Sequence, residues 1–237
     1  LNPKTTHQAM PLYLFIFLLF VILSYIVQNN LSRKFKAYAK IPLVSGMTGR
    51  EVAEKMLREH GITNVQVTCT EGFLTDHYNP ANGTVNLSKA VYFGNSVAAA
   101  AVAAHECGHA VQHATAYGPL TLRTALVPTV QIASNWMQWV LLAGILLIEV
   151  FPTILLIGII LFALTTLFSF VTLPVEIDAS QRACRWLCAA RITSPQDQPK
   201  AEAALRAAAY TYVVAALGSL ATLLYYVMIF LGSSNDD

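Results

Sequence analysis

Long apolar stretches constrain this sequence more than any other feature. Residues 11–28 carry no charge and approach the roughly 20 residues that one membrane-spanning helix needs. The block 126–173 is too long for a single span, and Glu149 followed by Pro152 predicts a turn that divides it in two. Residues 210–231 form a last apolar segment. The sequence therefore predicts four transmembrane helices.

Composition agrees with a membrane protein and excludes several other classes. Only 12% of the residues are charged, against about 25% in a typical soluble domain. With 15 Lys+Arg and 13 Asp+Glu the net charge is +2, so the chain lacks the basic footprint of a nucleic-acid binder. Four cysteines in 237 residues do not make a disulfide scaffold. We expect a lipid bilayer as a partner, no nucleic acid, and an oligomeric state that the sequence leaves open.

Basic residues predict the orientation of the spans. Lys4 alone lies before the first span, whereas the other 14 Lys and Arg fall in the two segments 29–125 and 174–209. Positive charge marks the cytoplasmic side, so both termini are predicted outside and both segments in the cytosol. The predicted organisation is a multi-pass cell-membrane protein with an anchor, a cytosolic part, a transmembrane hairpin, a cytosolic helix and a C-terminal span: residues 1–28, 29–125, 126–173, 174–209 and 210–237.

The first half of the predicted transmembrane hairpin is less apolar than the other spans. It contains four uncharged polar residues, so we expect this helix to face other helices rather than lipid. These residues are Gln131, Ser134, Asn135 and Gln138.

The cytosolic part reads as a small α+β unit. Thr48 and Glu51 match a capping box, which predicts a helix beginning there. Ser96 before a run of alanines predicts a second helix as far as Gln112. Between these helices the alternation of apolar residues and a cluster of turn formers predict a strand, a turn and a second strand: residues 65–69, 79–83 and 84–87.

A metal-binding motif lies on the second of these predicted helices. His105-Glu106-Cys107-Gly108-His109 matches H-E-x-x-H, in which two histidines four residues apart project from one helical face toward one zinc ion. Glu106, beside the first histidine, can act as general base toward a zinc-bound water. The alternative is a helix whose two histidines are ordinary surface or core groups.

A catalytic zinc site needs a third protein ligand. His113 is excluded, because eight residues along a helix separate it from His105 by about 12 Å. Among the downstream carboxylates, Glu176 and Asp178 lie on the predicted cytosolic side, at the start of a predicted helix 176–190. They point to different faces, so only one can bind the metal, and we choose Glu176 with Asp178 as a partner for a ligand histidine. The alternative is two acids stabilised at a helix N-terminus.

The chain resembles the YugP-like family of neutral zinc metallopeptidases, which are membrane proteins similar in style to the HtpX and CAAX-prenyl endopeptidases. The resemblance rests on the N-terminal anchor, TGREVAEKMLREHGI, TDHYNPANGTVNLSKAVYFGNSVAAAAVAAHECGHAVQ and LPVEIDASQRA. It implies a zincin-like fold with His105, His109 and Glu176 as ligands and Glu106 as base. The HtpX type carries Asp four residues after its ligand Glu, where this chain has Ser180.

Substrate contacts are less well defined by the sequence. A strand ahead of the zinc helix can bind a peptide at its edge, and residues 83–88 are the candidate. His77, Tyr78 and Arg182 are candidates for stabilising an oxyanion, with turn packing or membrane anchoring as the alternatives.

The predicted function is a membrane-anchored, zinc-dependent endopeptidase that acts on polypeptides. The alternative is a membrane pseudo-enzyme or assembly or chaperone factor that keeps the zinc fold for structure. An intramembrane protease of the site-two type is less favoured, because the apolar run before His105 is too short to span a bilayer.

Overall fold

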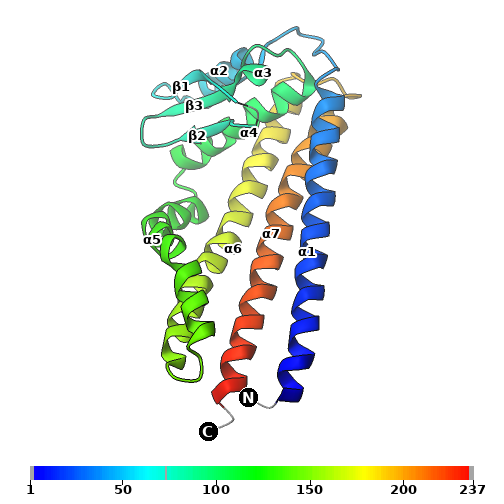
Figure 1. Ribbon diagram of the computed structural model, residues 1–237. Coiled ribbons are helices and arrows are strands. Elements are labelled where there is room, and N and C mark those ends of the chain that lie inside the picture. The colour runs from blue at the N-terminus through cyan, green and yellow to red at the C-terminus, as the bar shows by residue number, and fades with distance from the viewer. Residues whose placement is uncertain (1–2, 73, 235–237) are drawn as a thin grey trace. The chain divides into compact units, whose positions relative to one another are not determined.

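The computed structural model describes residues 3–72 and 74–234, and these are mainly helical. The chain divides into two compact units. We call Leu1–Ile26, Leu122–Thr172 and Thr211–Asp237 the helical unit, and Val27–Thr121 with Leu173–Tyr210 the mixed unit. The helices α1 (Pro3–Tyr38), α6 (Pro152–Ala189) and α7 (Gln198–Ser234) contribute residues to both (Figure 1).

A helical hairpin forms one side of the helical unit. α5 (Gly118–Leu146) ends just before Glu149, and α6 begins at Pro152, so the predicted turn is confirmed. Two glycines bring the paired helices close together: a Cβ on Gly144 would lie 2.5 Å from Leu155 Cα, and one on Gly158 would lie 2.8 Å from a methyl of Leu141. The hairpin therefore depends on missing side chains at its contact line.

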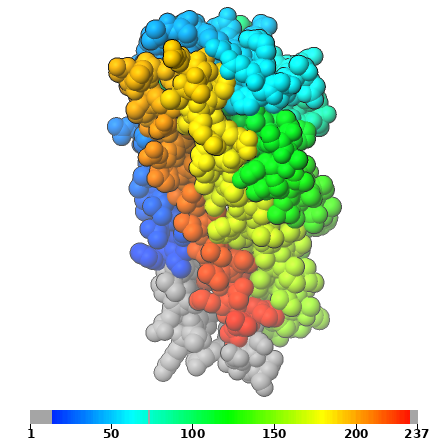
Figure 2. All heavy atoms as spheres, turned by 180° about the vertical axis from the view of Figure 1, so that it is seen from behind, coloured from blue at the N-terminus to red at the C-terminus, as the bar shows by residue number. Residues whose placement is uncertain are grey.

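Three helices are long and apolar enough to cross a membrane among the described residues. They are Leu14–Tyr38 of α1, α6 and Gln198–Gly232 of α7, and the most apolar window is that of α6, with a mean hydropathy of 2.7. α7 runs along the surface seen in Figure 2, and its side chains Leu217, Leu224 and Met228 are about half exposed. Side chains of this kind on an outer helical surface fit lipid better than water. α5 does not meet the same criterion, so a fourth span stays a prediction.

The predicted helix start at Glu176 is wrong. α6 is continuous from Pro152 to Ala189 and contains Pro174, so Glu176 lies well inside a 38-residue helix. Proline is tolerated there because the lost backbone bond is one of many in a long helix held by tertiary packing. Stabilisation by a helix N-terminus therefore does not explain this carboxylate.

The mixed unit holds the shorter elements. They are α2 (Gly49–Glu59), β1 (Gln66–Thr70), β2 (His77–Asn79), β3 (Thr84–Ser88), α3 (Lys89–Tyr92) and α4 (Val97–Ala114). Both predicted N-caps are confirmed: Thr48 and Glu51 form the reciprocal bonds of a capping box, and the Ser96 hydroxyl accepts from the Ala99 amide.

The sheet has three strands, one more than the sequence predicts. Its order is β1-β3-β2, with β1 parallel to β3 and β2 antiparallel to β3. The hairpin is therefore β2–β3, and β2 is missed because three residues are too few to show alternation. β3 lies in the centre, so the candidate substrate strand 83–88 has no free edge, and that prediction is wrong as it stands.

The core of the mixed unit lies between α2, β3 and α4. Met56, Val85, Leu87 and Val97 are fully buried, and Val85 and Leu87 share the inner face of β3. The alanine run of α4 is buried nearly throughout, because small side chains let neighbouring elements approach the helix from several directions. α4 is thus fixed along its length, and with it the histidines that it carries.

Candidate metal centre

Three side chains from two helices converge in the mixed unit. His105 and His109 lie one turn apart on α4, with ring centroids 4.8 Å apart, and Glu176 reaches them from α6. Glu176 Oε2 lies 3.3 Å from His105 Nε2 and 3.7 Å from His109 Nε2. One ligand atom from each residue lies within 4.8 Å of the others.

These separations suit a small divalent cation. Zinc bonds of about 2.0–2.1 Å in tetrahedral geometry place two ligand atoms roughly 3.4 Å apart. Two imidazole nitrogens and one carboxylate oxygen form a His₂Glu donor set, which leaves a fourth position for water or substrate. The donor set and the distances therefore fit zinc.

A buried glutamine fixes the orientation of His109. Gln112 Nε2 donates to the Val175 carbonyl and to Asp178 Oδ2, both at 2.8 Å. These partners can only accept, so the amide orientation is determined, and Gln112 Oε1 accepts from His109 Nδ1 at 3.0 Å. His109 therefore carries its proton on Nδ1 and presents the free Nε2 toward the metal position.

Ser180 plays the corresponding part for the other histidine. Its hydroxyl lies 3.1 Å from His105 Nδ1. It comes from α6, one turn beyond Glu176, where the HtpX type carries an aspartate. A hydroxyl can accept a hydrogen bond from the imidazole N–H as a carboxylate does, but it adds no charge beside the metal position. The departure in sequence therefore preserves the contact.

Asp178 does not join the metal group. Its carboxylate accepts from Gln112 and, at 2.6 Å, from Arg182 Nε, so it reaches His109 only through Gln112. The Arg182 guanidinium also lies 5.6 Å from the centre of the Tyr117 ring. Asp178 thus holds Arg182 in place, which disfavours the candidate role of Arg182 in stabilising an oxyanion.

Glu106 lies beside the metal group in a nearly closed environment. It is 8% exposed, on the same helix as both histidines. Burial alone would lower the pKa of His109, but the hydrogen bond that its protonated Nε2 donates to Glu176 and the negative charges of Glu106 and Glu176 outweigh burial and raise that pKa. The charge of Glu106 therefore acts on this centre.

The two remaining motif residues serve packing. Cys107 is fully buried, its Sγ lies 3.6 Å from the Ala53 carbonyl, and burial raises the pKa of its thiol. Gly108 is a position that the sequence analysis did not single out. A Cβ there would lie 2.6 Å from the Ala179 carbonyl of α6, so only glycine lets α4 and α6 approach closely enough to share a metal.

His113 is outside the metal group, as its spacing predicts. Its Nδ1 lies 2.9 Å from the Tyr78 hydroxyl, which comes from β2. His77 lies next to Tyr78 but bonds the Thr75 carbonyl through its own Nδ1, at 2.8 Å. Of the two predicted candidates on β2, only Tyr78 is therefore linked to the helix that carries the metal-binding histidines.

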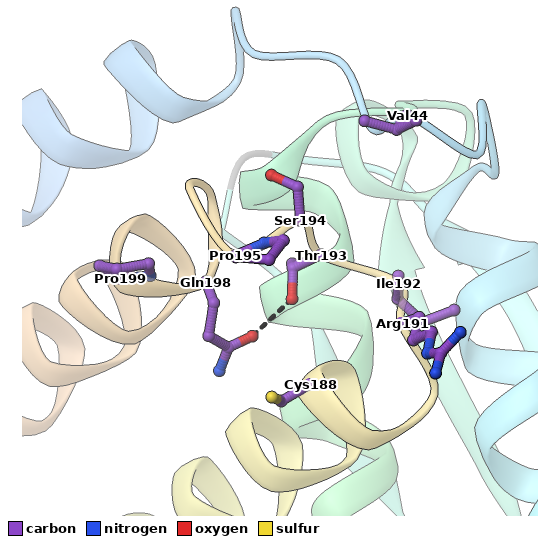
Figure 3. A pocket seen from close by; sticks show the side chains of 9 residues that line it. All are labelled: Val44, Cys188, Arg191, Ile192, Thr193, Ser194, Pro195, Gln198 and Pro199. Atoms are coloured by element: carbon purple, nitrogen blue, oxygen red, sulfur yellow. Dashed lines mark hydrogen bonds between the residues drawn. The ribbon is translucent and has the colours of Figure 1, made fainter.

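A pocket of the mixed unit lies apart from the metal-binding residues. It has a volume of about 540 Å³ and lies where α6 ends and α7 begins. Figure 3 shows Cys188, Arg191 and Ser194 around it, with Gln198 Oε1 accepting from the Thr193 hydroxyl. No His, Asp, Glu or second Cys is among its described lining residues, so this pocket offers Cys188 no companion metal ligand.

A helix carrying H-E-x-x-H, joined by a glutamate from a second helix, is the arrangement found in zinc peptidases, and three apolar helices mark the chain as a membrane protein. Residues 13–231 match the family described as "Putative neutral zinc metallopeptidase", and the chain belongs to this family. It is 39% identical over 226 residues to the "Putative membrane protease YugP" of Bacillus subtilis (strain 168), covering 95% of this chain and 100% of that protein. The resemblance inferred from sequence is confirmed. No solved structure matches.

Proposed function

We propose that this protein is a membrane-anchored zinc endopeptidase. The observation that carries the proposal is the convergence of His105, His109 and Glu176, with Glu106 beside them. A site built only for structure would be closed by a fourth protein ligand and would not need an adjacent buried carboxylate. Family membership and the membrane protease relative support the same reading.

The residues of the chain take distinct roles in peptide hydrolysis. Zinc, when bound by His105, His109 and Glu176, would lower the pKa of a water and polarise the scissile carbonyl. Glu106 takes a proton from the attacking water and then delivers it to the leaving amine. Gln112 and Ser180 keep both imidazoles in the tautomer that binds metal.

An extended substrate fits β2 better than the strand first considered. β2 is an edge of the sheet, and Tyr78 links it to His113 on α4. A peptide adding to this edge would gain main-chain hydrogen bonds close to the zinc helix. The Tyr78–His113 pair belongs in part to this edge strand, so we assign it the role of stabilising the oxyanion.

We also propose a multi-pass arrangement with four spans and a cytosolic active site. The three apolar helices and the distribution of Lys and Arg support it. α5 would supply the fourth span as the hairpin partner of α6.

Substitution of Glu106 by Gln tests the function most directly. In purified full-length protein we expect bound zinc to stay at the wild-type level, while cleavage of an unstructured polypeptide falls by about 10²–10⁴-fold. Glu54→Gln, which removes an exposed carboxylate of α2, is the matched control and should leave activity unchanged. Unchanged activity of Glu106→Gln with zinc retained would contradict the assigned base. Full rescue of a deletion strain by Glu106→Gln would favour the assembly-factor alternative.

A further inference from the structure

One face of α5 carries polar side chains that have no hydrogen-bond partner among the residues that the structure describes. Gln131, Ser134, Asn135 and Gln138 recur at the spacing of one helical face, and all four are exposed. Within residues 3–72 and 74–234 none of them makes a side-chain hydrogen bond. Among the described residues, these four side chains are exposed and do not face another helix, so the expectation is not met there.

The packing of α5 on α6 places part of this face at membrane depth. The Thr165 hydroxyl of α6 contacts Met137 Sδ of α5 at 3.6 Å. Thr165 is thirteen residues from Pro152, which is about 20 Å along the apolar helix α6. The hydrocarbon core of the bilayer that α6 is proposed to cross is roughly 30 Å thick. Asn135 and Gln138 lie within two residues of Met137 in sequence and therefore have nearly the same depth, where lipid offers no hydrogen bonds.

The side chains around these amides disfavour water as their hydrogen-bond partner. Ile132, Trp136 and Trp139 are each exposed by 63–65% and flank the polar residues on the same helix. A face that combines large apolar side chains with amides at the depth of the bilayer core suits a protein partner, because helices in membranes associate through close packing and side-chain hydrogen bonds.

We propose that this face, defined by Gln131, Ile132, Asn135, Trp136, Gln138 and Trp139, is a dimer interface that binds a second copy of the chain. A side-chain amide offers both a donor and an acceptor, so identical faces related by a two-fold axis along the membrane normal can pair Asn135 or Gln138 with the same residue of the other copy. Arg123, near its start, is the only charged residue of α5, so no like charges oppose this contact. Substrate helices of varied sequence would not supply matching amides.

Energy transfer between labelled full-length copies in phosphatidylethanolamine–phosphatidylglycerol liposomes tests the interface. We expect a dimer whose dissociation constant rises at least tenfold in Asn135→Leu/Gln138→Leu. The matched control is Gln28→Leu/Asn29→Leu, which removes the same two amides from an exposed part of α1 and should leave the dimer intact. The proposal would be overturned if the wild-type protein stays monomeric at all protein-to-lipid ratios. It would also be overturned if Asn135→Leu/Gln138→Leu keeps its helical content and dimerises like the wild type.

A cross-linking experiment covers the case in which the double variant does not fold. Exposed Cys69 and Cys188 are first replaced by Ser. Asn135→Cys should then form an intermolecular disulfide in the liposomes, whereas Ile160→Cys, on an exposed position of α6, should not. Equal cross-linking at both positions, or none at position 135, would also overturn it. Both readouts are independent of peptidase activity.

Discussion

α4 and α5 follow each other in the chain but have opposite relations to their surroundings. In α4 every residue is buried except His105, His113 and Ala114. In α5, which is longer by eleven residues, only Ala133, Leu141 and Gly144 are buried. α4 is the inside of a folded unit, whereas α5 is mostly surface.

The difference extends to the polar groups. Gln112 on α4 is fully buried, and both ends of its amide are bonded, to His109, Val175 and Asp178. Gln138 on α5 is exposed and has no such partners among the described residues. A glutamine thus orients a metal-binding histidine in α4, whereas a glutamine in α5 is exposed to the surroundings of the chain. Burial and bonding, not residue type, decide where a polar group supports chemistry.

The largest expected effect is the loss of the metal. Glu176→Ala removes the sole carboxylate of the donor set, so zinc affinity should fall by more than the roughly 100-fold typical for loss of an outer partner, and activity should disappear. Elemental analysis of detergent-purified protein measures this. Glu149→Ala, in the loop between α5 and α6, is the control and should bind zinc normally. Equal zinc content in both variants would break the assignment.

Next in size is the orientation of His109. Gln112→Leu keeps the volume but removes the acceptor for Nδ1, so metal affinity should fall 10–100-fold. Competition with a chromophoric chelator gives the affinity. Gln138→Leu makes the same change on α5 and should have no effect on metal binding. If both variants bind metal like the wild type, the Gln112 amide does not orient His109 for metal binding.

A third effect concerns the approach of α4 to α6. Gly108→Ala forces a Cβ to within 2.6 Å of the Ala179 carbonyl, which should destabilise the protein by about 1–3 kcal/mol. Gly118→Ala, at the start of α5, meets nothing within 4 Å and serves as the control. Denaturant unfolding in detergent compares them. Equal stability of the two variants would show that the close contact is dispensable.

The smallest effect is a pH dependence at the capping box of α2. Hydrogen bonds from the Thr48 backbone and hydroxyl hold the pKa of Glu51 below its ordinary value of 4.5. The carboxylate therefore stabilises the folded state above that pH, and the contribution is lost as the pH falls through the lower folded value. Unfolding of Glu51→Gln and wild type between pH 3 and 6 should show a shallower acid loss in the variant. Parallel curves would mean that the capping bond is not populated.

Much of the architecture follows from local pattern. The capping box, the Ser96 cap and the turn before Pro152 each depend on residues close in sequence, so they could be predicted. β2 could not be predicted because it is too short to show a period. The continuous course of α6 could not be predicted because proline usually ends a helix, whereas Pro174 is tolerated within it. Ser180 could have been noticed from sequence, since it lies one helical turn beyond Glu176, on the same face of the helix.

By itself, the sequence determined the helix that carries His105 and His109, because their spacing matches the pitch of an α-helix, and it determined the apolar segments, because hydropathy is a sum over residues. The tertiary structure alone decided that Glu176 meets both histidines, that Gln112 orients one and Ser180 contacts the other, and that β3 is central. Glu176 and Ser180 are more than sixty positions away from the histidines that they contact, and Gln112 is held by Val175 at a similar distance in sequence. These contacts depend on how the elements pack rather than on any local preference.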